Sequence, residues 1–372
     1  MKVVLDASAA AKPERTGIGH YVTRLAEALL ESDRDLELVL GVRLGRWRRR
    51  PHVWRPTGEA AGRASMRWFP SSWPSLRLPR ADVAHGPDER LVGVRGPEVV
   101  TIHDLFSLKS ASWSDAEFRE SKRRRHAETA RRAARILVPS AATARDVTEL
   151  LGVETARIVV APHGVGASFR PVDDALARPV LERLGVREPY VLFVGRTQPR
   201  KNVEAIVTVF ARLAARDDDL SLVIAGPDGY PPGRLASLVK ETGAVERVRL
   251  LGYTHDTDLP ALYTKARVLL FPSRDEGFGL PVLEAMACGC PTVVSDRGAL
   301  PEVAGPGAFA FGPDAFDDLE DGCRRLMEDE DVRRAEIARG TARAAEFGWS
   351  RAAATTLEAY RAAISASSSA AT

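Results

Sequence analysis

Short apolar runs alternate with segments of helical periodicity along almost the whole chain. Between the runs lie segments such as 203–216, in which Val203, Ile206 and Phe210 keep one apolar face. Near-continuous apolar strands are typical of a parallel sheet covered on both faces, and their alternation with helices predicts a doubly wound α/β fold. The ten runs rich in Val, Ile and Leu are 2–5, 36–42, 99–103, 135–139, 158–162, 190–195, 220–226, 248–252, 268–272 and 291–295.

The length of 372 residues predicts two domains rather than one. A polar stretch containing Gly and Pro, at about 165–188, separates two series of strands, and a fresh strand begins at Tyr190. We therefore expect Rossmann-like domains at 1–170 and 171–349. Two such sheets that face each other form a cleft outside the carboxyl ends of their strands, where ligands bind.

Composition excludes several classes of protein. With 45% hydrophobic and 28% charged residues, the chain has the balance of a folded protein rather than a disordered one. Its 3 Cys are too few for a secreted disulfide scaffold, and Asp6 interrupts the opening apolar run. No stretch approaches the roughly 18 apolar residues of a membrane span. We expect a cytoplasmic protein.

The formal net charge of +3 conceals an asymmetry between the two halves. Residues 1–170 hold 29 basic and 20 acidic residues, whereas residues 171–372 hold 24 basic and 30 acidic ones. Basic runs at 46–50 and 122–125 lie in the same half as Trp47, Trp54 and Trp73. Such runs are most often solvated surface, but they also fit peripheral contact with an anionic membrane at its inner face, or with an anionic acceptor. We expect no nucleic-acid partner, because no nucleic-acid-binding motif accompanies them.

Two glycines stand where the first strand gives way to a helix, in Thr16-Gly-Ile-Gly-His20. Gly17 and Gly19 permit a tight turn whose backbone can approach a ligand, and the N-terminus of the following helix favours a phosphate. A third glycine of the dinucleotide fingerprint is missing. An ordinary strand-to-helix turn explains this motif equally well.

Cations follow the strand at 190–195, in Gly195-Arg-Thr-Gln-Pro-Arg-Lys-Asn202. Arg196 and Lys201 at the carboxyl end of a strand suit a diphosphate, which Arg binds as a fork and Lys as a point charge. The alternative is a solvated turn. Of the three cations, we expect Arg200 to be the solvated one.

The richest segment is Glu276-Gly-Phe-Gly-Leu-Pro-Val-Leu-Glu284. Pro281 fits the first position of a helix, which puts Glu284 in the first turn and Glu276 in the loop before it. The N–H groups of that loop can face a charged or hydroxylated ligand, and the two carboxylates can accept from hydroxyls. Alternatively, Glu284 only complements the helix dipole.

His103 ends a strand in Val100-Thr-Ile-His-Asp-Leu105, at the edge of a parallel sheet where ligands bind. A single histidine is more often structural than functional, and His163, at the end of the strand 158–162, carries the same ambiguity. Cys288 and Cys290 have no further Cys or His ligands nearby in the sequence, so we expect no metal site.

In this order, these motifs resemble retaining, nucleotide-sugar-dependent glycosyltransferases of family 4, which have the GT-B fold. The most specific part of the resemblance runs from 271 to 291 and continues at 300–305. Arg15-Thr-Gly-Ile-Gly19, residues 100–105 and residues 193–202 are similar to the same family. Residues 347–350 and the last helix, at about 350–372, resemble the segment that crosses back to the N-terminal domain.

The resemblance implies a role for each matched residue. Arg196 and Lys201 match the pair that clamps the diphosphate, and Glu284 matches the glutamate that holds the ribose hydroxyls. Glu276 matches a glutamate near the donor sugar, and His103 matches a histidine close to the reaction centre. Gly17 and Gly19 match a glycine loop beside the donor phosphates. The loop that offers backbone N–H groups to the donor is matched by Gly277, Phe278, Gly279 and Leu280.

The resemblance implies a metal-independent transferase without a cofactor. It would move a hexose, mannose- or rhamnose-like, from a nucleotide-sugar donor to a glycan, a glycolipid or a small-molecule acceptor. Two alternatives stay open. One is a sugar-nucleotide epimerase of the same fold, and the other is a non-catalytic protein that binds nucleotides or nucleic acids.

Overall fold

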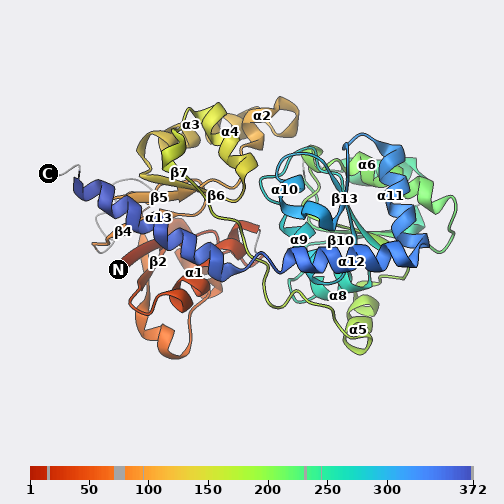
Figure 1. Ribbon diagram of the computed structural model, residues 1–372, viewed down its shortest axis with the longest axis horizontal. Coiled ribbons are helices and arrows are strands. Elements are labelled where there is room, and N and C mark those ends of the chain that lie inside the picture. Colours follow the sequence, from red (N-terminus) through yellow and green to blue (C-terminus); the bar gives the residue numbers. More distant parts are fainter. Residues whose placement is uncertain (15–16, 71–79, 95, 230–232, 244, 370–372) are drawn as a thin grey trace. The chain divides into compact units, whose positions relative to one another are not determined.

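The computed structural model describes residues 1–14, 17–70, 80–94, 96–229, 233–243 and 245–369 and divides into two compact units (Figure 1). The first unit comprises Met1–Lys109, Ala116–Gly164 and Gly348–Thr372. The second comprises Ser110–Asp115 and Val165–Phe347. Of the residues named above, Arg15, Thr16 and Trp73 lie outside the described residues.

The first unit is built on a seven-stranded sheet in the order β3-β2-β1-β4-β5-β6-β7, with every neighbouring pair parallel. Its strands are β1 (Lys2–Asp6), β2 (Glu37–Arg43), β3 (Ala64–Phe69), β4 (Val83–Gly86), β5 (Glu98–Thr101), β6 (Arg135–Val138) and β7 (Ile158–Val160). Its α-helices are α1 (Gly17–Ser32), α2 (Phe106–Lys109), α3 (Ala116–Arg132), α4 (Ala141–Leu151) and α13 (Trp349–Ser369). Short 3₁₀ segments include η1 (Leu44–His52), η2 (Gly58–Arg63) and η4 (Thr155–Arg157).

Alternate side chains of β1 enter the cores on the two faces of this sheet. Val3 and Leu5 pack in one cluster with α1 and with Leu357 of α13, whereas Val4 packs with Phe69 in another cluster. This alternation is the two-residue period of a strand, and it requires apolar residues at every position because both faces are covered. Figure 1 shows α13, in blue, lying beside α1, so the last helix completes the core that the first strand begins.

The second unit is built on a six-stranded parallel sheet in the order β10-β9-β8-β11-β12-β13. Its strands are β8 (Tyr190–Val194), β9 (Ser221–Ala225), β10 (Val248–Gly252), β11 (Val268–Phe271), β12 (Thr292–Ser295) and β13 (Phe309–Phe311). Its α-helices are α5 (Asp174–Leu184), α6 (Val203–Ala214), α7 (Arg234–Glu241), α8 (Leu259–Lys265), α9 (Leu280–Ala287), α10 (Leu300–Ala304), α11 (Phe316–Glu328) and α12 (Glu330–Ala344). The 3₁₀ segments are η3 (Ala111–Trp113), η5 (Pro199–Lys201), η6 (Val245–Arg247) and η7 (Gly305–Gly307).

The predicted α/β architecture is confirmed, and each of the ten apolar runs contains a strand. Three strands escaped prediction, for reasons visible in their sequences. In β3 exposed residues alternate with partly buried ones at the edge of the sheet, β4 includes His85 and Gly86, and β13 has only 3 residues. Within the described residues, no helix is both long enough and apolar enough to cross a bilayer.

Candidate functional site

The loops that follow β8 and β11 in the second unit lie side by side. Both strands end at the same edge because they are parallel neighbours in the sheet. The backbone N–H of Arg274 donates to the carbonyl of Arg200 at 2.7 Å, and the Arg200 guanidinium donates to the carbonyl of Asp275 at 3.0 Å. Two of the segments singled out in the sequence are thereby joined into one site.

A buried ion cluster lies where these loops meet. Lys201 donates to Glu276 Oε1, and Arg200 donates to Glu276 Oε2 at 3.1 Å. Lys201 and Glu276 are each only 7% exposed. Burial alone would raise the pKa of Glu276, but the attraction of Lys201 and Arg200 outweighs it and lowers that pKa to about 2. The Glu276 carboxylate is therefore charged in the folded protein.

Arg200 corrects the sequence-based expectation. It was expected to be solvated, but its side chain is only 11% exposed and is paired with Glu276. Arg196 is the exposed residue, and its guanidinium donates to the Asp228 carbonyl at 3.4 Å. The structure brings Lys201 and Glu276 together and directs Arg196 toward the loop after β9.

The backbone of Glu276 is also fixed. The N–H of Ala299 donates to the Glu276 carbonyl at 2.9 Å. Gly298, with φ of +59°, lies so close that a Cβ there would stand 2.5 Å from the same carbonyl oxygen. Only glycine combines this conformation with this approach, so Gly298 positions Glu276. It is a site residue that sequence reasoning missed.

The loop between Glu276 and α9 presents its backbone rather than its side chains. Phe278 is buried and packs edge-on against Phe347, with ring centroids 5.9 Å apart. Gly279 precedes the helix with φ of +104°, and a Cβ there would meet Leu300 at 2.7 Å. Gly277 and Leu280 complete the turn into α9. The N-terminal end of α9 is therefore a rigid backbone element suited to an anionic or hydroxylated ligand.

Glu284 lies one turn into α9, beyond the first turn in which it was expected. Its Oε2 accepts a hydrogen bond from the hydroxyl of Tyr263 at 3.0 Å. Burial, followed by the nearby Glu284, raises the pKa of Tyr263 well above its usual value. The phenol therefore stays protonated, and it holds the carboxylate in one orientation.

His103 lies in the first unit, directly after β5. One ring nitrogen, Nε2, is 2.8 Å from the Pro87 carbonyl, and the other, Nδ1, is 3.2 Å from Nε2 of His163. Tyr21 of α1 packs edge-on against the same ring, with centroids 4.8 Å apart. His163 and Tyr21 were not predicted as site residues. The only sequence signal for His163 was its position at the end of a strand.

Gly17 and Gly19 occupy the first turn of α1. The expectation that they form a tight turn ahead of the helix is therefore wrong, and neither is among the described glycines with positive φ. A Cβ at Gly17 would meet no heavy atom within 4 Å. What remains of the prediction is their place at the N-terminal end of a long helix, where an anion is favoured.

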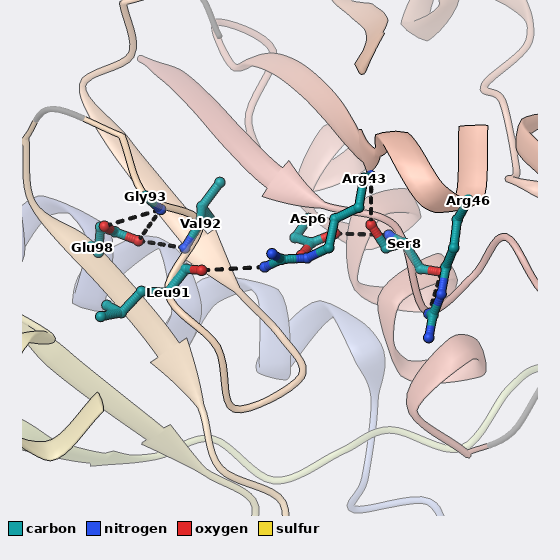
Figure 2. Close-up of polar contacts among 8 residues, drawn as sticks. All are labelled: Asp6, Ser8, Arg43, Arg46, Leu91, Val92, Gly93 and Glu98. Atoms are coloured by element: carbon teal, nitrogen blue, oxygen red, sulfur yellow. Dashed lines mark hydrogen bonds and ion pairs between the residues drawn. The ribbon is translucent and has the colours of Figure 1, made fainter. Parts of the chain in front are cut away.

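Two further carboxylates hold loops of the first unit, Asp6 at the carboxyl end of β1 and Glu98 at the amino end of β5 (Figure 2). Asp6 accepts from the Arg43 guanidinium at 2.9 Å, and the same guanidinium donates to the Leu91 carbonyl at 3.2 Å. Glu98 accepts from the backbone N–H groups of Val92 and Gly93. These contacts tie the loop after β4 to the ends of β1 and β2. Sequence reasoning assigned neither carboxylate a role.

The four cations at 122–125 of α3 are paired within the first unit, with the two carboxylates of Glu89 and Glu120. Lys122 pairs with the buried Glu89, and Arg123 and Arg124 both pair with Glu120. Arg132 likewise pairs with Glu128. By contrast, Arg48 and Arg49 of η1 are exposed and have no ion pair with any described residue. Exposed Leu44 belongs to the same segment.

No group of three His, Cys, Asp or Glu side chains within the described ranges is arranged to hold a metal ion. Cys288 and Cys290 are both buried thiols. They occupy the end of α9 and the residues just after it.

Comparison with known proteins agrees with this architecture. The sequence model for "Glycosyl transferases group 1" matches residues 182–343, and that for "Glycosyltransferase Family 4" matches residues 15–169. O-antigen chain mannosyltransferase B of Escherichia coli is 30% identical over 289 residues, which cover 77% of this chain and 76% of that protein. D-inositol 3-phosphate glycosyltransferase of Nocardia farcinica is 34% identical over 281 residues, which cover 73% of this chain and 62% of that protein.

The structure of sucrose-phosphate synthase from Thermosynechococcus elongatus matches with a TM-score of 0.75 at 21% identity, over 98% of this chain and 99% of that one. This likeness extends over both units and shows the fold, which is GT-B. The resemblance noted in the sequence is thus confirmed. The chain belongs to glycosyltransferase family 4, whose members transfer a sugar from a nucleotide sugar.

Proposed function

We propose that this enzyme is a retaining hexosyltransferase that works without a metal ion. It moves a mannose- or rhamnose-like sugar from a nucleoside diphosphate to a hydroxyl of a glycan, a glycolipid or a small molecule. The observation that carries the proposal is the buried cluster of Lys201, Arg200 and Glu276. Lys201 and Arg200 are fixed cations at this edge of the sheet, where they would attract a leaving group that gains negative charge.

We assign a role in donor binding to several residues of the second unit. Lys201 and Arg196 bind the diphosphate, and the backbone N–H groups at 277–280 complement its charge. Glu284, held by Tyr263, accepts from the ribose hydroxyls. The site would then stabilise the departing diphosphate by fixed charges and dipoles, which is the part that a bound cation takes in other transferases.

The step itself breaks the bond between the anomeric carbon and the diphosphate oxygen, which takes the electron pair. The sugar becomes oxocarbenium-like, the acceptor hydroxyl attacks from the same face, and its proton passes to the departing phosphate. A double displacement would need a carboxylate oxygen free to attack the anomeric carbon. Both oxygens of Glu276 are engaged, by Lys201 and by Arg200, which argues against Glu276 as that nucleophile and leaves Asp104 as the other candidate for the rival route.

The names of the similar proteins support the choice of sugar and acceptor. One is a mannosyltransferase of an O-antigen chain, and the other acts on an inositol phosphate. A hexose donor and a polyol or glycan acceptor fit both. This part of the proposal rests on similarity over roughly three quarters of the chain.

The proposal also includes peripheral contact with an anionic membrane or acceptor surface through the first unit. It assigns this contact to η1, where Arg48 and Arg49 are exposed, rather than to α3, whose cations are largely paired. Leu44, 52% exposed, adds an apolar side chain to the same surface. Basic and apolar residues together are what an interfacial segment needs.

A thermal-shift screen against UDP-, GDP-, dTDP- and ADP-sugars tests the donor. A ligand at 100 times its Kd adds about 2.7 kcal/mol to the free energy of unfolding, which such a screen detects. The best donor is then incubated with mannosyl, inositol and lipid-linked acceptors in the presence of EDTA. We expect product with retained anomeric configuration.

Three results would refute the proposal. One is an inverted product, and another is activity that EDTA abolishes and added metal restores. The third is an epimerised donor formed without any acceptor, which would make the enzyme an epimerase of the same fold.

A further inference from the structure

Three rings gather at the carboxyl edge of the sheet in the first unit. Tyr21 comes from α1, His103 follows β5 and His163 follows β7. The centroid of the Tyr21 ring is 4.8 Å from that of His103 and 4.6 Å from that of His163, and the two imidazoles are 5.3 Å apart. His163 is only 4% exposed. The three rings are packed tightly enough to restrict one another's rotation.

The hydrogen bonds of His103 determine where its proton lies. A carbonyl oxygen can only accept, so the contact between Nε2 and the Pro87 carbonyl at 2.8 Å places the hydrogen on Nε2. In a neutral ring Nδ1 is then an acceptor. Nε2 of His163, 3.2 Å away, must therefore be the donor in the contact between the two imidazoles. Both nitrogens of His103 are engaged within the protein.

The surroundings keep both rings neutral. Burial lowers the pKa of His103, and the Pro87 carbonyl, Asp88 and Asp104 oppose this effect without cancelling it, while Lys122 adds to it. Burial, followed by the proximity of His103, lowers the pKa of His163 well below its usual value. The assignment of hydrogens made from geometry therefore holds at neutral pH.

The partners of His103 are themselves held in place. The hydroxyls of Tyr21 and Thr101 are 2.9 Å apart, and Thr101 is 2.7 Å from Nε2 of His85. Nδ1 of His85 is in turn 2.7 Å from the hydroxyl of Tyr360 in α13. A continuous series of hydrogen bonds thus runs from the last helix to the ring that packs on His103.

The backbone of His163 is fixed by the residue after it. A Cβ at Gly164 would stand 2.3 Å from the backbone nitrogen of Trp349, so only glycine allows the chain to pass there. The Trp349 ring also stacks on His163, with centroids 6.0 Å apart and an interplanar angle of 13°. His163 is therefore an unusually constrained hydrogen-bond donor.

We infer that His163 is a positioning residue: the Pro87 carbonyl fixes His103 in the Nε2–H tautomer, and the His163 donor occupies Nδ1 and so holds the ring in one orientation. His103 then enters the reaction as a neutral, immobile group, and it cannot accept the acceptor's proton while both of its nitrogens are engaged. The inference rests on the proposed function in one respect, that His103 contributes to transfer. Its structural part stands without that assumption.

The test reads the tautomer directly. Histidine-labelled full-length protein, which contains 7 His, is studied by ¹H–¹⁵N ring spectra, with His103→Gln to assign the His103 signals. We expect the wild-type His103 ring to be in the Nε2–H form and to gain its second proton only below the ordinary histidine pKa of about 6.5. In His163→Phe we expect the Nε2–H form to persist, because Pro87 holds it, and the ¹⁵N signal of Nδ1 to move toward that of an imidazole nitrogen without a hydrogen bond.

The conservative variant separates a positioning role from a structural one. Glutamine carries an amide N–H about as far from the backbone as Nε2, whereas the N–H of asparagine stops short of it. His163→Gln should keep the wild-type Nδ1 signal of His103 and the wild-type transfer rate. His163→Asn and His163→Phe should lose roughly ten-fold to a hundred-fold in kcat with little change in the donor KM. Asn also serves where Phe impairs folding, as judged by thermal melting.

The outcomes distinguish this inference from the proposed function. An unchanged Nδ1 signal of His103 in folded His163→Phe or His163→Asn overturns the inference, whatever the activity. A wild-type His103 signal that titrates near pH 6.5 overturns it as well. If the Nδ1 signal moves as expected but no donor and acceptor pair reacts with the wild type, it is the proposed function that fails.

Discussion

The hydroxyl of Tyr263 donates a hydrogen bond to Glu284 across 3.0 Å, from α8 to α9. The phenol is fully buried while the carboxylate is only partly buried, so the tyrosine supports a group that still faces outward. Glu284 is therefore not a simple complement to the helix dipole. The Tyr263 hydroxyl holds its carboxylate in one orientation.

Tyr263→Phe should weaken the binding of a nucleoside diphosphate by roughly three-fold to ten-fold, the range of one net hydrogen bond. Calorimetry with the nucleotide measures this loss. Inorganic pyrophosphate, which lacks the ribose, is the matched control and should bind as it does to the wild type. An equal loss for both ligands would contradict the role of Glu284 at the ribose.

Lys201→Ala should lower kcat/KM by at least roughly a hundred-fold while the protein still folds, since one fixed charge near a leaving group is worth that much or more. Steady-state transfer with the identified donor measures the effect, and circular dichroism checks the fold. Lys201→Arg keeps the positive charge and should lower kcat/KM less than Lys201→Ala does. Near-normal turnover in purified Lys201→Ala would rule out the clamp.

Arg196 and Arg200 should differ when each is replaced by Met. Arg196 is exposed, so Arg196→Met should weaken diphosphate binding and leave the melting temperature unchanged. Arg200 pairs with buried Glu276. Arg200→Met should therefore lower both the affinity for diphosphate and the melting temperature, because a buried carboxylate loses one of its two cations. Paired thermal melts and titrations with pyrophosphate make the comparison. Equal changes of melting temperature and of pyrophosphate affinity in the two variants would contradict the role of Arg200 in the ion cluster.

Glu276 should make stability depend on pH in the acid range. Its pKa is lowered to about 2 in the folded protein, below the ordinary value of about 4.3, so its contribution is present above the ordinary pKa. That contribution is lost as the pH falls through about 4 toward 2. The stability gap between wild type and Glu276→Gln, measured by urea unfolding, should therefore shrink from pH 7 to pH 3. A gap that grows on acidification would contradict the ion cluster.

The same carboxylate should matter more for catalysis than for binding. We expect Glu276→Gln to reduce kcat strongly and to change the affinity for the free nucleoside diphosphate much less, because the carboxylate is proposed to lie near the donor sugar. Calorimetry that showed lost nucleotide affinity with a normal kcat would refute this division.

Binding to vesicles should distinguish η1 from α3. Arg48→Gln combined with Arg49→Gln should reduce binding to anionic vesicles at low salt, by about 1 kcal/mol for each charge near the surface. The control is Arg123→Gln combined with Arg124→Gln, whose wild-type side chains pair with Glu120. Co-sedimentation over a salt series measures both. Equal losses in the two double variants would assign the contact to net charge alone.

The fold was largely predictable because buried parallel strands are apolar at every position. The strands that were missed are short or lie at an edge, where that signal is absent, as in β3 and β13. Of the site, the sequence indicated that Lys201 and Glu276 follow strands of one parallel sheet, and the structure brings these two residues together. Arg200 was misjudged because its partner is distant in sequence and becomes a neighbour only through the pairing of β8 with β11.

Contacts between distant segments were beyond sequence reasoning for the same reason. Nothing in the sequence joins His163 to His103 or Tyr263 to Glu284, because each pair depends on the order of strands and on helix packing. For Gly17 and Gly19 the error was different, because a local pattern led to a prediction that the structure contradicts. A familiar spacing predicted a turn, but the helix begins early enough to include both residues.

The return of α13 to the first unit has a consequence for biosynthesis. Leu357 and Tyr360 belong to the same core as Val3, so that core stays open until the far end of the chain has left the ribosome. The second unit, which from Val165 to Phe347 is almost one continuous segment, emerges complete before then. In a nascent chain the usual N-terminal-first order of folding should therefore be reversed. The second unit folds first, and the first unit folds once α13 has been synthesised.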